Sequence, residues 1–247
     1  MTTLEPRPAT FSLDPVDVST VQERVYQSLR LALLKGQFLP GEQVSIRNLA
    51  QALGTSAMPV REAVRRLVSE KAFEQSTDRL LRVAPYVAAE HEEYIRIRMQ
   101  LEGYAADRAT VAKTPQMIDA LAVHNEAMRR ALGSADFEAA LAANQAFHFE
   151  IYRAAGSPQL VDIIASLWLR TGPILAASRN SAGLFERLFD IGCSVHEEII
   201  EAIARKDRAA ARRAVNLDIR AAHVSIRRAL IAAHADGSMT ARPKQRR

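Results

Sequence analysis

The chain has 247 residues, of which 48% are hydrophobic and 25% charged, with a formal net charge of +5, a balance typical of a globular protein with one or two domains. Because aromatic residues make up only 6% and runs of β-branched residues are scarce, a mainly α-helical fold is expected. The single cysteine, Cys193, excludes an internal disulfide and a cysteine-based zinc site, and the lack of a signal-peptide core or an apolar run of about 18 residues favours a cytoplasmic protein with no membrane partner.

The N-terminal part of the chain begins with a polar segment and continues into a helix. Residues 1–18 are polar and contain three prolines, so a flexible arm is expected there. From about Thr20 to Lys35, apolar side chains recur at helical spacing, which predicts a helix with one buried face. Pro40 and Gly41 then favour a tight turn, because proline fixes φ and glycine accepts a positive φ.

Two short helices separated by a turn are predicted after this point. Ser45 is suited to cap a helix that runs to Leu53, and Gly54 is suited to end it in the left-handed region. Ser56 is suited to cap the following helix, whose apolar residues at i, i+3, i+4 and i+7 form one buried stripe. A short helix, a turn and a second helix with arginines turned outward is the arrangement that presents a recognition helix to the major groove of DNA.

The second of these helices is therefore expected to contact double-stranded DNA. Arg61 lies away from the apolar stripe and is the best candidate for a contact with a base or a phosphate. The other residues expected at the DNA are Arg47, Ser56, Ala57, Met58, Arg65 and Arg79.

A β-hairpin is predicted after the recognition helix. Residues 72–75 and 80–83 are short enough to pair around residues 76–78. The hairpin would make the first domain, residues 19–85, a winged helix-turn-helix. Arg79, at the tip, is placed to reach a phosphate or the minor groove.

The rest of the chain is predicted to form an antiparallel bundle of six helices, which completes a mainly α fold. Prolines, glycines and short polar stretches divide it into helical segments with short connections. This second domain, residues 86–235, precedes a basic tail, residues 236–247, which is expected to be flexible and either solvated or weakly attracted to DNA. The six helices are expected at about 88–111, 115–132, 136–155, 158–178, 184–205 and 207–234.

Four polar side chains of the second domain are candidate ligands of a divalent metal. Asn144 and His148 lie one turn apart on an otherwise apolar helix face. His196 lies on a later apolar face, and Asp218 lies among small residues, where a buried carboxylate is costly unless it meets a cation or donors. Two imidazoles, a carboxylate and an amide oxygen suit an ion such as zinc, nickel or manganese. The alternatives are ordinary core histidines, or a hydrogen-bonded triad of His148, His196 and Asp218 that holds a ligand directly.

Spaced residues in the first domain form a specific pattern: Leu29-Arg30, Gly36, Pro40-Gly41, Leu49-Ala50, Leu53-Gly54-Thr55-Ser56, Pro59-Val60-Arg61-Glu62-Ala63 and Leu67. On this pattern the region resembles the DNA-binding half of the GntR family of bacterial transcription regulators. Ala57 stands where many members have an arginine, and Met58 replaces a small hydroxyl residue, so a variant operator is expected. Lys71 and Leu80 replace glycines that are common in the wings of that family, which leaves the contacts of the wing open.

A second pattern lies in the bundle: Arg98 with Leu101-Glu102, Asn144 with Phe147-His148, and His196 with Ala202-Ile203 and Asp207. On these matches, residues 90–230 resemble the FCD ligand-binding domain of the FadR branch of GntR regulators. The resemblance implies a metal held by an Asp or Asn, by a His four residues later, and by one His on each of two later helices. Asn144, His148 and His196 take the first three places.

The fourth metal ligand and the role of Arg98 each have an alternative. Counting from Asp207, the last histidine of the family falls at Asp218, and His223 points in another direction on the same helix, so Asp218 is preferred and His223 is the alternative. The resemblance implies that Arg98 binds the carboxylate of an organic-acid effector beside the metal. The alternative is a structural ion pair with Glu102, four residues later.

Together these features predict a ligand-responsive transcription regulator that is not an enzyme. It would bind a palindromic DNA operator as a homodimer and sense a small organic acid. One alternative is a DNA-binding protein whose bundle is purely structural and holds no metal. The other is a metal-dependent enzyme joined to a DNA-binding module, although the chain has no HExxH or GxSxG motif.

Overall fold

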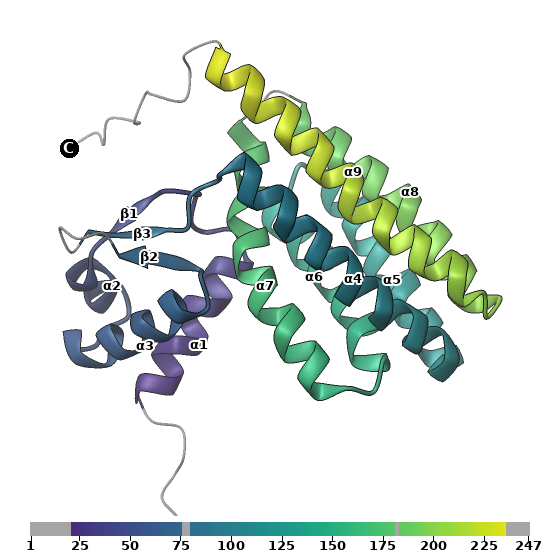
Figure 1. Ribbon diagram of the computed structural model, residues 1–247, viewed down its shortest axis with the longest axis horizontal. Helices are drawn as coiled ribbons and strands as arrows, with labels where there is room; N and C mark the ends of the chain where they lie inside the picture. Colours follow the sequence, from purple (N-terminus) through teal and green to yellow (C-terminus); the bar gives the residue numbers. More distant parts are fainter. Residues whose placement is uncertain (1–20, 76–79, 181–182, 236–247) are drawn as a thin grey trace, which may run out of the picture.

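The computed structural model describes residues 21–75, 80–180 and 183–235, which form two parts (Figure 1). The first part contains three helices and a small sheet, and the second is a bundle of longer helices. The predicted mainly α fold, with a winged helix-turn-helix before a helical C-terminal domain, is confirmed. The predicted arm, residues 1–18, and the predicted tail, residues 236–247, lie outside the described residues.

The helix-turn-helix forms with the caps that its sequence favours. The Oγ of Ser45 accepts a hydrogen bond of 3.1 Å from the backbone N–H of Asn48, so Ser45 caps its helix as predicted. Gly54 has a φ of +61° in the turn. Ser56 stands at the next N-cap, but its side chain makes no capping hydrogen bond within the described chain. The three helices are α1 (Val21–Leu34), α2 (Ile46–Ala52) and α3 (Ala57–Ser69).

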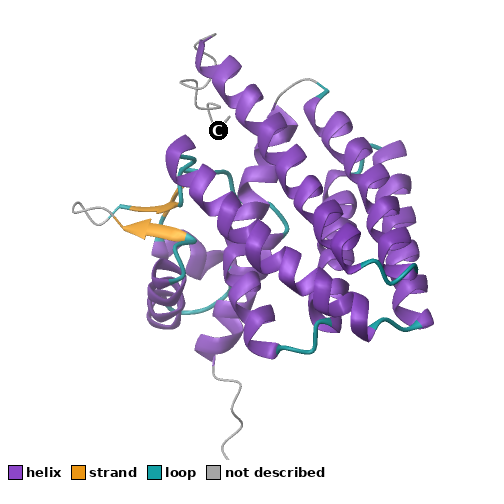
Figure 2. Cartoon of the chain, turned by 45° about the vertical axis from the view of Figure 1, so that its right-hand side comes forward, coloured by secondary structure: helices purple, strands orange, loops and turns teal. Residues whose placement is uncertain are grey.

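The wing is a three-stranded antiparallel sheet that lies on one side of the helices (Figure 2). The predicted pair is present as β2 (Phe73–Gln75) and β3 (Leu81–Val83). The sequence did not indicate β1 (Gln43–Val44), which pairs with the other side of β3, because two residues are too few to carry an alternating pattern. Arg79, at the tip of the wing, lies outside the described residues.

The chain leaves α3 through Lys71, whose φ is +61°. The following residue, Ala72, donates its backbone N–H to the carbonyl of Leu67 at 2.9 Å and closes the helix end. Glycine adopts this left-handed conformation without strain, whereas in a lysine the Cβ atom lies too close to the backbone. The glycine that the family commonly has at this position would therefore allow the positive φ. The wing still forms with Lys71 there, since β2 and β3 pair.

The bundle contains the six predicted helices, each within a few residues of its predicted ends. Its first and last helices run antiparallel, because Arg208 donates to Asp107 at one end at 2.7 Å, while His223 lies 2.8 Å from Glu92 toward the other. The helices are α4 (Ala88–Ala112), α5 (Pro115–Gly133), α6 (Phe137–Ala154), α7 (Pro158–Ala176, followed by a 3-10 turn, Ala177–Asn180), α8 (Leu184–Ala204) and α9 (Arg208–Ala235).

Helix α7 joins the two parts of the molecule. The expectation that the chain lacks an apolar run of about 18 residues is wrong by length and composition, because Pro158–Arg179 has a mean hydropathy of 1.4 and is the one described helix long and apolar enough to cross a membrane. Most of it is buried, and Leu169 belongs to the core of the first domain. A helix that packs against the bundle on one side and α1 on the other is apolar for that reason.

Candidate functional site

A cavity of about 50 Å³ lies inside the bundle among α4, α6, α7, α8 and α9. Its walls combine apolar side chains with a nearly equal number of polar ones, as suits a site for a small polar ligand. The polar side chains that line it are His91, Arg98, Asn144, His148, Trp168, Thr171, Asp218 and His223.

Three of the predicted metal ligands meet at one side of this cavity. The Nε2 atom of His148 lies 3.1 Å from Oδ2 of Asp218 and 3.3 Å from Nε2 of His196. The same nitrogen of His196 lies 3.9 Å from Oδ1 of Asp218. Ligand atoms about 2.0–2.2 Å from one zinc ion are separated from each other by distances of this size. The three side chains could therefore share one ion, and we call them the His–His–Asp cluster.

Two outer hydrogen bonds place hydrogen on the Nδ1 atoms of the histidines. The amide nitrogen of Asn125 donates to the carbonyl of Cys193 at 3.0 Å, so its oxygen faces Nδ1 of His196 at 3.1 Å and accepts a hydrogen bond from it. The Tyr152 hydroxyl donates to Glu102 and accepts from Nδ1 of His148 at 3.2 Å. A proton on Nδ1 of each ring leaves Nε2 free to offer a lone pair to a metal, whereas a proton on Nε2 of His148 donates instead to Oδ2 of Asp218 at 3.1 Å.

Burial and neighbours set the charges of the cluster. Burial lowers the pKa of His196 to about 3, so this ring is neutral at physiological pH. Its plane also stacks on the Phe147 ring with centroids 3.7 Å apart, which holds its orientation. Burial alone would raise the pKa of Asp218, but the hydrogen bond with His148 and nearby positive charge outweigh it, so the pKa is lowered and the group is a carboxylate.

The remaining predicted ligands occupy different positions. Asn144 lines the same cavity one turn before His148 and is partly buried. His223 also lines the cavity, but its Nε2 lies 2.8 Å from Oε2 of Glu92, outside the His–His–Asp cluster. The structure therefore brings Asp218 rather than His223 beside the two histidines.

Arg98 forms the structural pair that the sequence left as an alternative. Its Nε donates to Oε1 of Glu102 at 2.6 Å, and its Nη2 donates to Oε2 at 3.1 Å, with both side chains buried. The guanidinium also lies 5.1 Å from the Trp168 ring and borders the cavity. Arg98 thus forms a buried ion pair with Glu102 and also lines the cavity.

Several residues of the site had not been identified from the sequence. Tyr152 lies one turn after His148, and His91 lies two turns before Arg98, so helical spacing could have suggested both. Asn125 could not have been found in this way, because it reaches His196 from a different helix.

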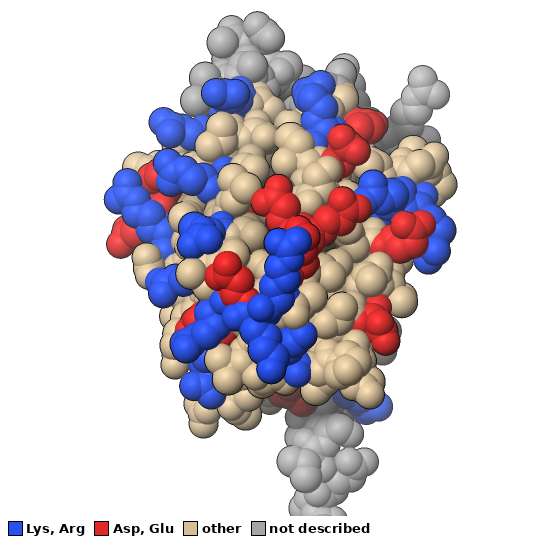
Figure 3. Space-filling model, turned by 90° about the vertical axis from the view of Figure 1, so that its right-hand side faces the viewer, with Lys and Arg blue, Asp and Glu red and all other residues tan. Residues whose placement is uncertain are grey.

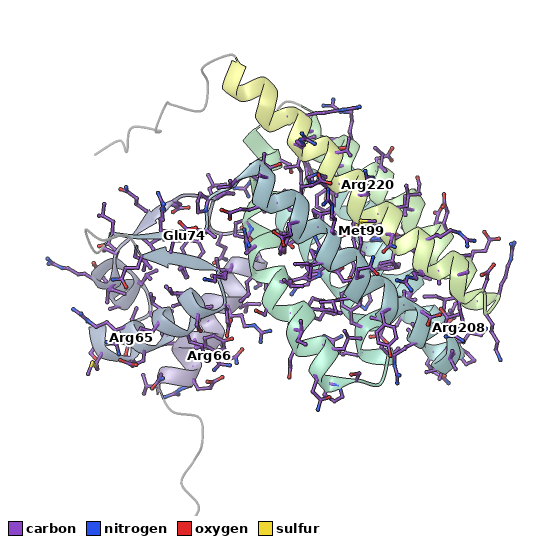
Figure 4. All side chains as sticks on the ribbon, in the orientation of Figure 1. Arg65, Arg66, Glu74, Met99, Arg208 and Arg220 are labelled. Atoms are coloured by element: carbon purple, nitrogen blue, oxygen red, sulfur yellow. The ribbon has the colours of Figure 1, made fainter. Side chains whose placement is uncertain are left out.

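The predicted DNA-contacting residues within the described chain are all exposed, and two of them share a groove. Arg61 and Arg65 line a groove between α3 and the sheet, beside Ser45 and Gln75. Arg65 is on the outer part of α3 (Figure 4), where it also pairs with Glu62 at 2.6 Å. The other predicted contacts within the described chain are likewise exposed: Arg47, Ser56, Ala57 and Met58.

Arg66, which follows Arg65, has a different role. It pairs with Glu23 at 3.0 Å, and its guanidinium lies 3.6 Å from the ring centre of Tyr26, so it fastens α3 to α1. The face of the molecule in Figure 3 carries basic and acidic side chains side by side. Arg208 and Asp107, at the end of the bundle, form such a pair at 2.7 Å. The groove along α3 therefore has the better features for binding a DNA backbone.

Comparison with known proteins identifies both parts. Residues 21–77 match the model of the bacterial regulatory proteins of the gntR family, and residues 93–221 match the FCD domain. The HTH-type transcriptional regulator McbR of Escherichia coli is 34% identical over 150 residues, which is 61% of this chain and 68% of that protein. A probable D-xylose utilization operon transcriptional repressor of Paenarthrobacter nicotinovorans is 27% identical over 189 residues, 76% of this chain and 81% of that protein.

Solved structures agree with this assignment. The structure of E. coli McbR/YncC superposes with a TM-score of 0.77 at 28% identity and covers 85% of this chain and 99% of that chain. A putative GntR regulator from Rhodococcus sp. RHA1 has the same fold, with a TM-score of 0.70 at 20% identity over 84% of this chain and 98% of that chain. The chain therefore belongs to the GntR family of bacterial transcription regulators, with an FCD domain after its helix-turn-helix, and it is a DNA-binding regulator rather than an enzyme.

Proposed function

We propose that the protein is a cytoplasmic homodimer that binds a palindromic operator through α3 and senses a small organic acid at a divalent metal in the bundle cavity. A dimer is expected because one winged helix covers only one half-site. Exposed apolar side chains on the bundle, such as Ile97, Tyr104 and Leu217, offer surface for such contacts. Sedimentation at micromolar concentration that gives only a 27.3 kDa species would contradict the dimer.

The observation that carries the metal proposal is the convergence of three acceptors. When Nδ1 of each ring carries the proton of its outer hydrogen bond, Nε2 of His148 and Nε2 of His196 present lone pairs beside the carboxylate of Asp218. Three acceptors without a donor between them repel one another, and either a proton or a cation would relieve this. The donor set of two imidazoles and a carboxylate suits zinc, nickel or manganese, with Asn144 as a weaker oxygen ligand.

A bound divalent ion would explain why the effector is an acid. One carboxylate in the cluster leaves a 2+ ion with excess positive charge, which a carboxylate of the effector would complete. Arg98 adds a positive charge at the cavity wall, although two of its nitrogen atoms are held by Glu102. The small volume of about 50 Å³ favours a short acid over a large ligand.

The two faces of α7 provide a route from the cavity to the DNA-binding domain. Trp168 and Thr171 line the cavity, whereas Leu169 and Gly172 face α1. Helix α1 in turn packs on α3, to which Arg66 fastens it. A ligand that shifts α7 would therefore move the recognition helix.

Removal of the cluster histidines tests the metal. The variant His148→Ala/His196→Ala is expected to lose the divalent metal that purifies with the wild type in the absence of chelator, measured by elemental analysis. His124→Ala, on α5 away from the cavity, is the matched control and should keep the metal. Equal metal in wild type and double variant, or none in either together with undiminished acid binding, would make the cluster a hydrogen-bonded pocket.

Substitution of Arg61 tests the DNA-binding face. Arg61→Ala is expected to weaken specific operator binding by about 1–3 kcal/mol if the side chain reaches a base. Arg130→Ala is the control, since Arg130 is similarly exposed but lies on α5. Binding and footprint are measured for both at one salt concentration. An unchanged footprint for Arg61→Ala would exclude this residue from the interface.

A further inference from the structure

A second polar group of the cavity lies apart from the His–His–Asp cluster. His91 on α4 and His223 on α9 both line the cavity, both are buried to 4% exposure, and their rings lie 5.0 Å apart. On α9, His223 follows Asp218 by five residues, a distance of about 7.5 Å along the helix axis. The cavity therefore has two polar ends.

Three buried polar atoms around this cavity have no hydrogen-bond partner among the described residues. They are Nδ1 of His91, Nδ1 of His223 and Nε1 of Trp168. Trp168 is 2% exposed, so solvent does not satisfy its N–H. Buried polar atoms are satisfied in most proteins, so three exceptions around one cavity point to a ligand that completes them.

The hydrogen bonds at this end indicate which ligand group it would bind. Nε2 of His223 and Oε2 of Glu92 share a hydrogen bond of 2.8 Å that lowers the pKa of Glu92, while Nδ1 of His223 has no partner among the described residues. Burial lowers the pKa of His91 to about 3, so that ring is neutral. The cations nearby are engaged elsewhere: Arg98 pairs with Glu102, Arg170 lies 5.0 Å from the Tyr94 ring centre, and Arg227 lies 4.0 Å from Glu92.

An indole N–H beside a neutral imidazole suits a hydroxyl group better than a second carboxylate. The indole N–H of Trp168 only donates, whereas the neutral His91 ring offers one donor and one acceptor nitrogen. A hydroxyl both donates and accepts, so it can meet all of these atoms, whereas a carboxylate only accepts.

We propose that His91, His223 and Trp168 form a hydroxyl-binding subsite and that the effector is a short hydroxy acid whose carboxylate lies at the His–His–Asp cluster. This inference rests on the proposed function, because it assumes that an acid occupies the cavity. It adds the chemical class of that acid. The separation of the two ends along α9 corresponds to a chain of only a few carbons, in agreement with the small cavity.

The test compares three matched four-carbon acids on the full-length protein purified without chelator. Butyrate, 4-hydroxybutyrate and succinate are titrated by calorimetry. We expect 4-hydroxybutyrate to bind about tenfold more tightly than either of the others, the effect of one well-satisfied buried hydrogen-bonding group. In His91→Phe and in His223→Phe, each measured separately, this preference should fall to less than about twofold.

The controls separate this inference from the proposed function. An unchanged circular dichroism spectrum shows that each variant is folded, two independent variants guard against the loss of one, and His124→Phe should keep the wild-type preference. If no acid binds the wild type, the proposed function and this inference both fail. If the acids bind without a hydroxyl preference, with succinate preferred, or with a preference that both variants retain, the subsite is wrong and acid sensing stands.

Discussion

Gly172→Ala is expected to destabilise the protein and to uncouple its two parts. A Cβ atom on Gly172 would lie 2.1 Å from the carbonyl oxygen of Leu33 and 2.9 Å from that of Leu34. Both neighbours are backbone atoms of α1, so no side-chain rotation relieves the clash, and α1 must move away from α7. Overpacking of this kind costs about 1–3 kcal/mol. Helix α3 packs on α1, so a displaced α1 would no longer transmit a movement of α7 to α3. Operator binding should therefore also lose its dependence on the acid.

Chemical denaturation and operator binding, with and without an acid that binds the wild type, measure these effects. Gly133→Ala is the matched control, because a Cβ at this glycine meets nothing within 4 Å, and its stability should stay within about 1 kcal/mol of wild type. If Gly172→Ala matches the control in stability and still responds to the acid, the contact between α1 and α7 does not transmit the signal.

Glu102→Ala is expected to cost about 3–5 kcal/mol of unfolding free energy, because it leaves the Arg98 guanidinium buried without its counter-ion. Glu102 is 0% exposed and Arg98 6% exposed, so water cannot replace the lost partner. The carboxylate also accepts from Tyr152, which in turn orients His148. The same variant should therefore weaken metal binding about 10- to 100-fold, the usual effect of losing an outer partner of a ligand.

The matched comparison is the double variant Arg98→Met/Glu102→Leu, which removes both charges and fills similar volume. Replacing a buried ion pair by apolar side chains is often neutral or stabilising, so the double variant should recover most of the stability lost in Glu102→Ala. Urea denaturation at constant pH measures all three proteins. A double variant as unstable as Glu102→Ala would mean that the pair is not the cause of the loss.

The sequence by itself determined the elements and their order. Helix ends depend on neighbouring residues in the chain, so Ser45 could be predicted as a cap, and it accepts from the N–H of Asn48 at 3.1 Å. Prolines, glycines and short polar stretches are local signals too, and they predicted the boundaries of the bundle helices within a few residues. The same local spacing placed Asn144 beside His148 on one face.

The tertiary structure alone decided how separate elements meet. Whether Arg98 binds an acid or Glu102 depends on which groups surround it. The hydrogen-bond partner of His196 is Asn125, which comes from another helix, so no local pattern indicates it. Strand β1 forms only because it pairs with β3, and it has no local signal either. The contact of α1 with α7 and the buried atoms without partners also come from packing. Such contacts join residues far apart in the chain, and their energies depend on burial and distance in three dimensions, which residue spacing does not encode.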